Sequence, residues 1–475
     1  MRSEGEPRVP FPLSDVSNGE WCPRPPSARQ RLAARLIAEE CDRRARRHGM
    51  RRAEFLRTAA GTATAFWVLN LVHGLDQRGD AAVLPLTREQ CDDLGAAREV
   101  LDRHLFVMDV QLHHVDLNLP DPSRFCFIRF GERRQDASKP CAERTQLLGQ
   151  ANFVREVFVG SETDVGVISG VPSGVLLPPQ TMADTRDLVN HLAGSERALS
   201  QAMIDPKAPP GSPTALDSME HQVRDLGAVA LKCYTYNGNW WLDDERVSYP
   251  MLAEATRLGL RLINCHKGLP NLAFFPLSAE YVRTRDLPKV VRDWPGLKFC
   301  AYHAGYFPEE GGNGEFIRVA RSLPRKYRRN LYAEIGSSFA ITFLDSPAKA
   351  AFFIGRLLKT LGSRNILWGT DCVWWGSPQW LIDAFKTLRI PAPMRERYGF
   401  PPLTRRAKRR ILGLNAARLY GVDPRARRCA IAADRIALER AAQGGFRAGR
   451  SLRAYGPRTR REFLALLRHG TSRPS

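Results

Sequence analysis

The sequence predicts an α/β protein whose core is a (β/α)₈ TIM barrel, flanked by an N-terminal extension and a basic C-terminal tail. Three observations support this prediction. Eight short apolar runs rich in Val, Ile, Leu and Phe follow one another between residues 105 and 374. Segments with helical periodicity separate these runs. No Gly-x-Gly phosphate turn follows the first run, which disfavours the competing open, doubly wound sheet.

The apolar runs are interpreted as strands buried on both faces, because continuous apolar residues are typical of a parallel sheet that helices cover on both sides. These strands are expected at 105–115, 164–171, 201–205, 227–236, 260–268, 297–305, 330–339 and 366–374, of which the third is the weakest. Stretches with a helical apolar face lie between the later strands, for example at 249–259 and 346–362. The barrel is therefore expected to occupy residues 100–424.

The N-terminal extension, residues 1–99, has several parts. Residues 1–30 are polar and proline-rich, which predicts a flexible lead, and residues 30–48 predict a basic helix. Residues 50–72 contain an Arg pair, Phe-Leu and a weakly apolar stretch, a pattern similar to a degenerate twin-arginine export signal. An amphipathic surface helix is the alternative, so both a cytoplasmic and an exported protein stay open. No stretch reaches the roughly 20 apolar residues of a transmembrane helix.

The net charge of +21, from 71 Lys and Arg against 50 Asp and Glu, is concentrated at the ends of the chain. Residues 404–475 hold 19 basic and 4 acidic residues, whereas residues 61–403 are nearly balanced, with 39 and 38. A phosphate-tracking groove would need the excess on the folded body, so nucleic-acid binding is not expected as the main function. The tail, residues 425–475, is expected to be an appendage. None of the ten cysteines has CxxC spacing, which excludes zinc ribbons and thioredoxin-like motifs.

Candidate functional residues lie where the predicted strands end. The first strand ends with Gln111 and His113, the fifth with His266, the sixth with His303 and the eighth with Asp371. In a (β/α)₈ barrel, functional side chains come from the carboxyl ends of the strands and meet at one mouth. Neutral imidazole and carboxylate are typical ligands of zinc and similar divalent ions. The pattern therefore predicts a metal or catalytic cluster, although each residue alone could be a hydrogen-bonded core residue or a helix cap.

These strand ends lie within motifs that resemble the amidohydrolase superfamily, in the branch that contains aminocarboxymuconate-semialdehyde decarboxylase and related aromatic-acid decarboxylases and hydrolases. The motifs are DVQLHH, INCHKGLPN, YHAGY, AEIGSSF, LWGTDCVWWGSPQW and ILGLNAARLYGV. The resemblance covers residues 100–422 and is most specific in its C-terminal half. It implies a (β/α)₈ barrel with one divalent metal ion at its mouth. Zinc is the first expectation and manganese the alternative.

The resemblance also implies roles for individual residues. His113, His266 and Asp371 correspond to metal ligands. Gln111 stands where the family has the first His of a His-x-His pair, and its amide oxygen is a weaker ligand than imidazole. Asp371 is further expected to act as general base, and His303 to orient or protonate the substrate.

Two other side chains are candidates for substrate binding. Lys232 on the fourth strand is expected to be structural or to bind a substrate carboxylate; the alternative, implied by other branches of the superfamily, is a modified Lys that bridges two metal ions. Trp374, which follows the eighth strand, is expected either to line an aromatic or apolar pocket or to pack the loop.

Together these residues predict a metal-dependent hydrolase of the amidohydrolase type, in which activated water attacks a small, cyclic or aromatic carboxylate, ester, lactone or amide. A carboxy-lyase that uses the same site is the alternative. A binding barrel that has lost its metal, as Gln111 suggests, is the non-enzymatic alternative. The expected partner is a small-molecule substrate, and a homo-oligomer stays open.

Overall fold

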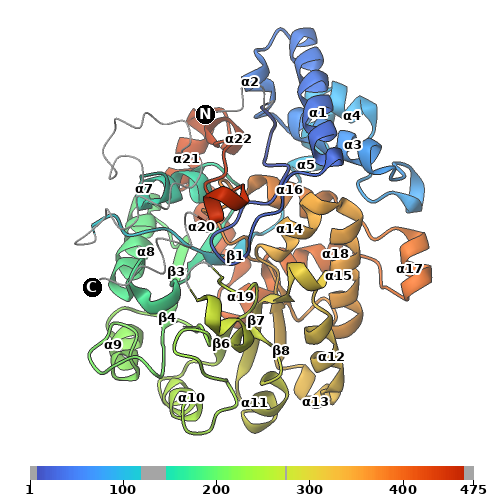
Figure 1. Ribbon diagram of the computed structural model, residues 1–475. Helices are drawn as coiled ribbons and strands as arrows, with labels where there is room; N and C mark the ends of the chain where they lie inside the picture. Colours follow the sequence, from blue (N-terminus) through green and yellow to red (C-terminus); the bar gives the residue numbers. More distant parts are fainter. Residues whose placement is uncertain (1–7, 119–145, 273–274, 465–475) are drawn as a thin grey trace.

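Parallel strands form the centre of the computed structural model, which describes residues 8–118, 146–272 and 275–464 (Figure 1). The strands are β1 (Met108–Leu112), β2 (Val165–Ile168), β3 (Ala198–Ser200), β4 (Ala202–Met203), β5 (Leu231–Cys233), β6 (Leu262–Gly268), β7 (Lys298–Tyr306), β8 (Leu331–Glu334) and β9 (Ile366–Leu367). Successive strands pair in parallel in the orders β1-β2-β3 and β4-β5-β6-β7-β8-β9. Each of the eight predicted runs overlaps a strand.

Backbone hydrogen bonds join these strands into a ring. β3 and β4 are separated by Gln201 alone, so together they form the third of eight strands. At the seam between the first and last strands, the Val110 amide donates to the Trp368 carbonyl at 3.0 Å. The Asp371 amide likewise donates to the Gln111 carbonyl at 3.0 Å. The predicted (β/α)₈ barrel is therefore confirmed.

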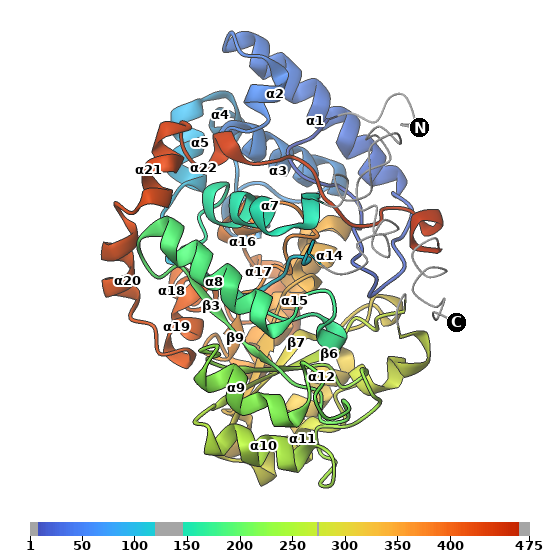
Figure 2. The ribbon, with the colours of Figure 1, turned by 90° about the vertical axis from the view of Figure 1, so that its left-hand side faces the viewer.

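Helices surround the barrel (Figure 2). They are α7 (Gln150–Val154), α8 (Pro179–Ala193), α9 (Met219–Arg224), α10 (Ser248–Arg257), α11 (Leu287–Asp293), α12 (Gly314–Ser322), α13 (Arg325–Arg328), α14 (Ser338–Asp345), α15 (Pro347–Leu361), α16 (Gln379–Thr387), α17 (Ala392–Tyr398), α18 (Arg405–Arg409) and α19 (Asn415–Leu419). α15 illustrates why they pack here. Its residues Ala351, Ile354, Leu357 and Leu358 recur every three or four positions and are buried.

A helical layer precedes the barrel, comprising α1 (Ala28–Arg47), α2 (Arg52–Phe55), α3 (Ala59–His73), α4 (Arg88–Asp92) and α5 (Leu94–Leu101). α3 contains the apolar part of the twin-arginine-like segment. It is not the amphipathic surface helix considered above, because nearly all of its residues from Ala59 to Asn70 are buried. Its apolar composition is thus explained by packing within the fold. Among the described residues, no helix combines the length and apolarity that crossing a membrane requires.

The predicted flexible lead is a packed segment instead. Between residues 10 and 21 nearly every side chain is buried, including Phe11, Val16 and Trp21. Phe11 stacks on Trp380 of α16 with ring centroids 5.2 Å apart. Proline-rich composition predicted flexibility, but the aromatic and aliphatic side chains between the prolines find partners on the barrel.

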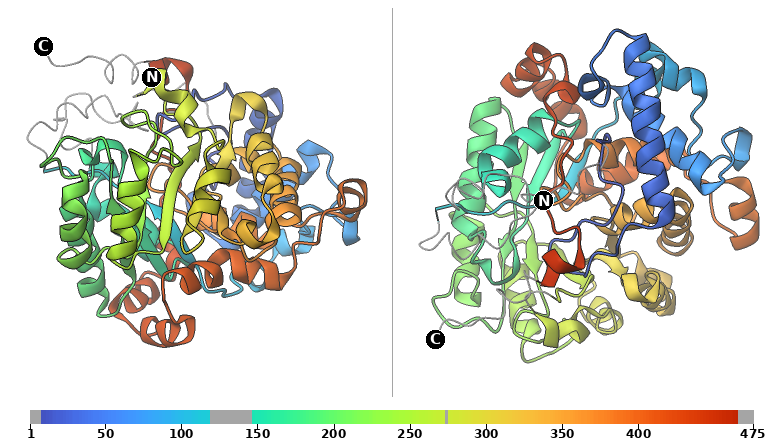
Figure 3. Two further views of the ribbon diagram at one scale, coloured as in Figure 1. Left: turned by 90° about the horizontal axis from the view of Figure 1, so that it is seen from below. Right: turned by 45° about the horizontal axis from the view of Figure 1, so that its top comes forward.

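The prediction that residues 425–475 form an appendage is also wrong for the described part of that tail. α20 (Pro424–Ile431), α21 (Arg435–Ala442) and α22 (Phe446–Gly449) pack on the body. Arg447 is buried, and its guanidinium donates to carboxylates of both Asp102 and Asp383 at 2.6–2.8 Å. Figure 3 (right) shows the segments before α1 and after α22 over the same end of the barrel. The Ser17 amide there donates to the Pro457 carbonyl.

Candidate metal and catalytic centre

The carboxyl ends of four strands bring five predicted site residues together. Gln111 and His113 come from the end of β1, His266 from β6, His303 from β7, and Asp371 from the turn after β9. All five are buried. His303 and Asp371 have left-handed backbone conformations, with φ of 65° and 59°. Such conformations cost a residue with a side chain on the order of 1 kcal/mol, and they cluster where a fold aims a functional group.

Each of the three imidazoles at the centre has one nitrogen fixed by a backbone carbonyl. His113 Nδ1 lies 2.6 Å from the Ser169 carbonyl, and His303 Nδ1 lies 2.8 Å from the Gly336 carbonyl. His266 Nε2 lies 3.0 Å from the carbonyl of Leu269. A carbonyl only accepts, so each of these nitrogens donates, and a neutral ring then carries a lone pair on its other nitrogen. Such carbonyl partners are the usual supports of metal-binding histidines.

The other nitrogens point to the centre of the cluster. His113 Nε2 lies 3.3 Å from Asp371 Oδ1. His266 and His303 have ring centroids 4.6 Å apart. Burial lowers the pKa of His303 to about 4 and that of His266 well below its usual value. Both rings are therefore neutral near pH 7, with an electron pair available to a cation or a proton.

Asp371 is surrounded by donors. Its Oδ2 accepts hydrogen bonds from the Ser337 hydroxyl and, at 3.2 Å, from Asn18 Nδ2. Burial alone would raise the pKa of this carboxyl, but the contacts with His113, His303 and Ser337 outweigh it, so the pKa lies below its ordinary value. The carboxylate form is thus favoured at neutral pH, as a metal ligand or general base requires.

Gln111 lies between Asp371 and His303 in the cluster. Its Nε2 lies 3.2 Å from Asp371 Oδ1 and 3.3 Å from His303 Nε2. Its Oε1 is buried and has no hydrogen-bond partner among the described residues. Rotating the side-chain amide by 180° exchanges the two atoms, which would turn the oxygen toward Asp371 and His303. Gln111 therefore lies where its amide oxygen can reach an ion held by those residues.

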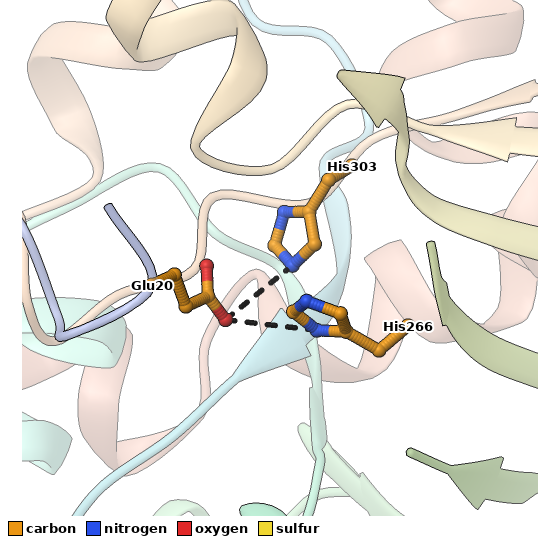
Figure 4. Close-up of side chains that lie close together, drawn as sticks. All are labelled: Glu20, His266 and His303. Atoms are coloured by element: carbon orange, nitrogen blue, oxygen red, sulfur yellow. Dashed lines mark ion pairs between the residues drawn. The ribbon is translucent and has the colours of Figure 1, made fainter. Parts of the chain in front are cut away.

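A sixth group, Glu20, reaches the centre from the N-terminal segment. Its Oε1 lies 3.6 Å from His266 Nδ1 and 3.8 Å from His303 Nε2, as Figure 4 shows. The ligand atoms of these three residues all lie within 4.8 Å of one another. The strand-end pattern does not reveal Glu20, because this residue lies outside the barrel in a stretch whose proline-rich composition predicts flexibility. The apolar residues around it, such as Val16 and Trp21, were the available signal.

The donor set fits a divalent cation. Imidazole nitrogens face carboxylate oxygens in three contacts, between His113 and Asp371, His266 and Glu20, and His303 and Glu20. Where both facing atoms carry a lone pair, they repel each other unless a proton or a metal ion lies between them. Burial and the charge of Asp371 raise the pKa of Glu20 well above its usual value. A divalent ion bound among Glu20, His266 and His303 would provide this buried carboxylate with a cation.

Lys232 lies inside the barrel beneath this cluster. It is fully buried, its Nζ has no hydrogen-bond partner among the described residues, and the ammonium lies 3.6 Å from the ring centroid of Tyr302. Burial lowers its pKa to about 8, and the neighbouring Glu334 is the main opposing influence. The Glu334 carboxylate accepts hydrogen bonds from the backbone amides of His303 and Gly336. Burial raises the pKa of Glu334 to about 8.

The two tryptophans after Asp371 have different surroundings. Trp374 is buried in an apolar cluster with Val115, Leu148, Val373, Tyr455 and Phe463. Its carbonyl accepts from the Tyr455 amide. Trp375 instead donates its indole N–H to Ser337, which contacts Asp371, and stacks on Trp21. Of the two interpretations of Trp374, packing of the loop is the one that its contacts support.

A family model described as Amidohydrolase matches residues 170–422, which is more than half of the chain and includes three of the five strand-end residues. The chain belongs to the amidohydrolase family. This confirms the resemblance inferred from the strand-end motifs. No curated protein matches this amidohydrolase at a significant level.

The solved structures that match this chain are distant in sequence. An uncharacterized TIM-barrel protein from Bordetella bronchiseptica is 19% identical, covers 67% of this chain and 99% of its own, and has a TM-score of 0.43. A 5-carboxyvanillate decarboxylase from Sphingomonas paucimobilis is 15% identical, with coverages of 67% and 100% and a TM-score of 0.41. A protein from Acinetobacter baumannii described as a probable 2-pyrone-4,6-dicarboxylic acid hydrolase is 14% identical, with coverages of 66% and 99% and a TM-score of 0.39.

Proposed function

We propose that this amidohydrolase is a metal-dependent hydrolase that acts on a small, cyclic or aromatic carboxylate, ester, lactone or amide. The observation that carries the proposal is a network of contacts at the barrel mouth: His113 lies 3.3 Å from Asp371, Gln111 lies 3.2 Å from Asp371 and 3.3 Å from His303, and the rings of His266 and His303 are 4.6 Å apart. His113, His266 and Asp371 would hold the ion, with the Gln111 amide oxygen as a further, weaker ligand. Zinc is the ion that the imidazole ligands favour, and manganese is the alternative. When bound, such an ion lowers the pKa of water and polarises a carbonyl.

Two side chains would move protons. Asp371 is the carboxylate available to take a proton from the attacking water, because its low pKa keeps it charged and Ser337 and Asn18 fix its orientation. His303 is neutral near pH 7, so its Nε2 can accept the proton that Asp371 takes from water and pass it to the leaving group. The hydrogen bond from His303 Nδ1 to Gly336 fixes the ring for that transfer.

Lys232 would select the substrate. Its buried ammonium lies near the rings of Tyr234 and Tyr302 and the charges of Glu334 and Asp371, and among the described residues it has no hydrogen-bond partner. A carboxylate on the substrate would supply the missing partner, since a buried cation without a hydrogen bond is energetically costly. We therefore propose a substrate that carries at least one carboxylate near its reacting carbon.

The same observation favours a second candidate, a carboxy-lyase. A carboxylate held beside Lys232 could be the group that leaves as carbon dioxide. The bond between the ring carbon and the carboxylate breaks, and the ring carbon takes a proton that water supplies through Asp371 or His303. The hydroxide left from that water combines with carbon dioxide as bicarbonate, so bonds and charges balance with water as the further reactant. The cluster serves either reaction, so the substrate decides between the two.

Product analysis tests the proposal. The purified protein is incubated with lactones and with aromatic carboxylic acids, and both ring-opened acid and carbon dioxide are measured. Formation of a ring-opened acid supports the hydrolase. Release of carbon dioxide without a hydrolytic product would replace it with the carboxy-lyase. Elemental analysis of protein purified without chelator tests the metal, and less than about a tenth of an equivalent of any divalent ion would favour a metal-free binding barrel.

A further inference from the structure

Glu20 is a carboxylate from outside the barrel that lies among the metal-binding side chains. We propose that Glu20, which belongs to the N-terminal segment (residues 9–26), is a ligand of the bound metal ion. Its carboxylate adds a negative charge that the ligands from the barrel do not supply. The inference rests on the proposed metal-dependent function. Its basis is that Glu20 Oε1 lies 3.6 Å from the free Nδ1 of His266 and 3.8 Å from Nε2 of His303 (Figure 4).

Two unpartnered atoms point to an ion at this place. Oε2 of Glu20 and Nδ1 of His266 are both buried without a hydrogen-bond partner among the described residues. Within that same part of the chain, no Lys or Arg nitrogen lies within 4.0 Å of the Glu20 carboxylate. A buried carboxylate without a cation is unfavourable, whereas one that shares an ion with two imidazoles has the commonest ligand chemistry of zinc.

The charge of the site supports the same assignment. Gln111 is neutral, so His113, His266 and Asp371 offer one negative charge to a divalent cation. With Glu20 as a further ligand, two negative charges of the ligands balance the two positive charges of the cation. In a buried, low-dielectric site, ligands whose charge balances that of the ion are favoured over ligands that leave it unbalanced.

The N-terminal segment is held firmly enough to position a ligand. Trp21 stacks on Trp375 with ring centroids 6.0 Å apart. Ser17 donates its backbone amide to the Pro457 carbonyl, and Gly456 lies so close that a Cβ there would meet the Ser17 carbonyl oxygen at 2.0 Å. Asn18, two residues before Glu20, donates to Asp371. The segment is thus fixed on both sides of Glu20.

The test compares the zinc affinity of full-length wild type with that of Glu20→Gln, by competition with a chromophoric chelator. Removing the charge is expected to weaken zinc binding by at least about tenfold. Asp15→Asn is the matched control, because it disrupts the Asp15–Arg24 ion pair within the same segment and leaves the Glu20 carboxylate in place. We expect Asp15→Asn to keep the wild-type affinity.

Two further measurements distinguish the loss of a metal ligand from misfolding of Glu20→Gln. Glu20→Asp keeps the charge but shortens the side chain, so it should give an intermediate affinity. The visible spectrum of the cobalt-loaded protein should differ between wild type and Glu20→Gln, since a ligand has been changed. Equal zinc affinity and equal cobalt spectra in the two proteins would overturn this inference alone. Failure of the wild type to bind zinc or manganese would overturn the proposed function as well.

Discussion

Nε2 of His113 lies 3.3 Å from Oδ1 of Asp371, and the same ring is fixed from behind by the Ser169 carbonyl at 2.6 Å. The two residues belong to the first and last strands of the barrel, whose hydrogen-bonded seam places them side by side. An ion bound beside this contact would take the imidazole nitrogen and the carboxylate oxygen as ligands.

Replacement of His113 should remove the metal. His113→Ala deletes the nitrogen that faces Asp371, so we expect less than about a tenth of an equivalent of bound ion and at least about a 100-fold loss of kcat/KM. Elemental analysis and steady-state kinetics measure both. His114→Ala is the matched control, because Nε2 of His114 instead contacts the Thr185 hydroxyl at 2.9 Å. Equal metal loss in the two variants would contradict the assignment of His113.

Gln111→His should strengthen zinc binding. The substitution creates the His-x-His pair of the family on β1, and imidazole is a better zinc ligand than an amide oxygen. We expect zinc affinity to rise by about tenfold in a chelator competition assay. Gln111→Ala, which offers no ligand atom, should show no gain. Tighter binding by Gln111→Ala than by Gln111→His would show that this position does not face the ion.

Lys232→Met should weaken substrate binding without lowering the stability of the folded protein. The change removes a buried ammonium that has no hydrogen-bond partner, so the folded protein should be as stable as wild type or more stable. For substrates with a carboxylate, KM should rise by about tenfold or more, because a charged hydrogen bond contributes about 1.5–3 kcal/mol. Thermal unfolding and kinetics test the two expectations. A variant with unchanged KM for carboxylate substrates would refute the role of Lys232.

Asp164 should make stability depend on pH. It is buried, its Oδ2 accepts the Val107 amide at 2.9 Å, and burial raises its pKa to about 6 from an ordinary value of 3.8. The folded state therefore holds the proton more tightly than the unfolded state, and the stabilisation present below pH 4 is lost as the pH rises through 6. The loss should be on the order of 2 kcal/mol.

Urea unfolding at pH values from 4.5 to 7.5 measures this effect. Asp164→Asn keeps an oxygen that can accept from Val107 but does not titrate. The free energy of unfolding of wild type minus that of Asp164→Asn should therefore fall across this range. A difference that is constant or rises with pH would contradict the raised pKa.

Arg447 should anchor the C-terminal helices. Its guanidinium is buried between Asp102 and Asp383, so Arg447→Met leaves two carboxylates without their cation. Breaking a buried ion pair from one side costs about 3–5 kcal/mol, which denaturant unfolding would detect. Arg425→Met on α20 is a suitable control, because Arg425 is exposed. Equal stability of the Arg447 variant and wild type would restore the view of this region as an appendage.

The sequence by itself determined the barrel and most of the cluster. Continuous apolar runs have one low-energy solution, a parallel sheet covered by helices, and residues such as His266 and His303 at the ends of such runs must meet at the mouth. His113 and His114 contact different partners, the Ser169 carbonyl and the Thr185 hydroxyl, as side-chain alternation along an extended chain requires. These are local periodicities, and one chain segment is enough to reveal each of them.

Only the tertiary structure decided what covers the mouth. Glu20 lies in a segment without helical or strand periodicity, and its packing depends on Trp375 and Pro457, which are far away in the chain. The burial of Arg447 likewise depends on Asp102 and Asp383. A sequence pattern records the secondary structure that a segment can form, but burial and charge compensation depend on partners that only the folded chain brings into contact.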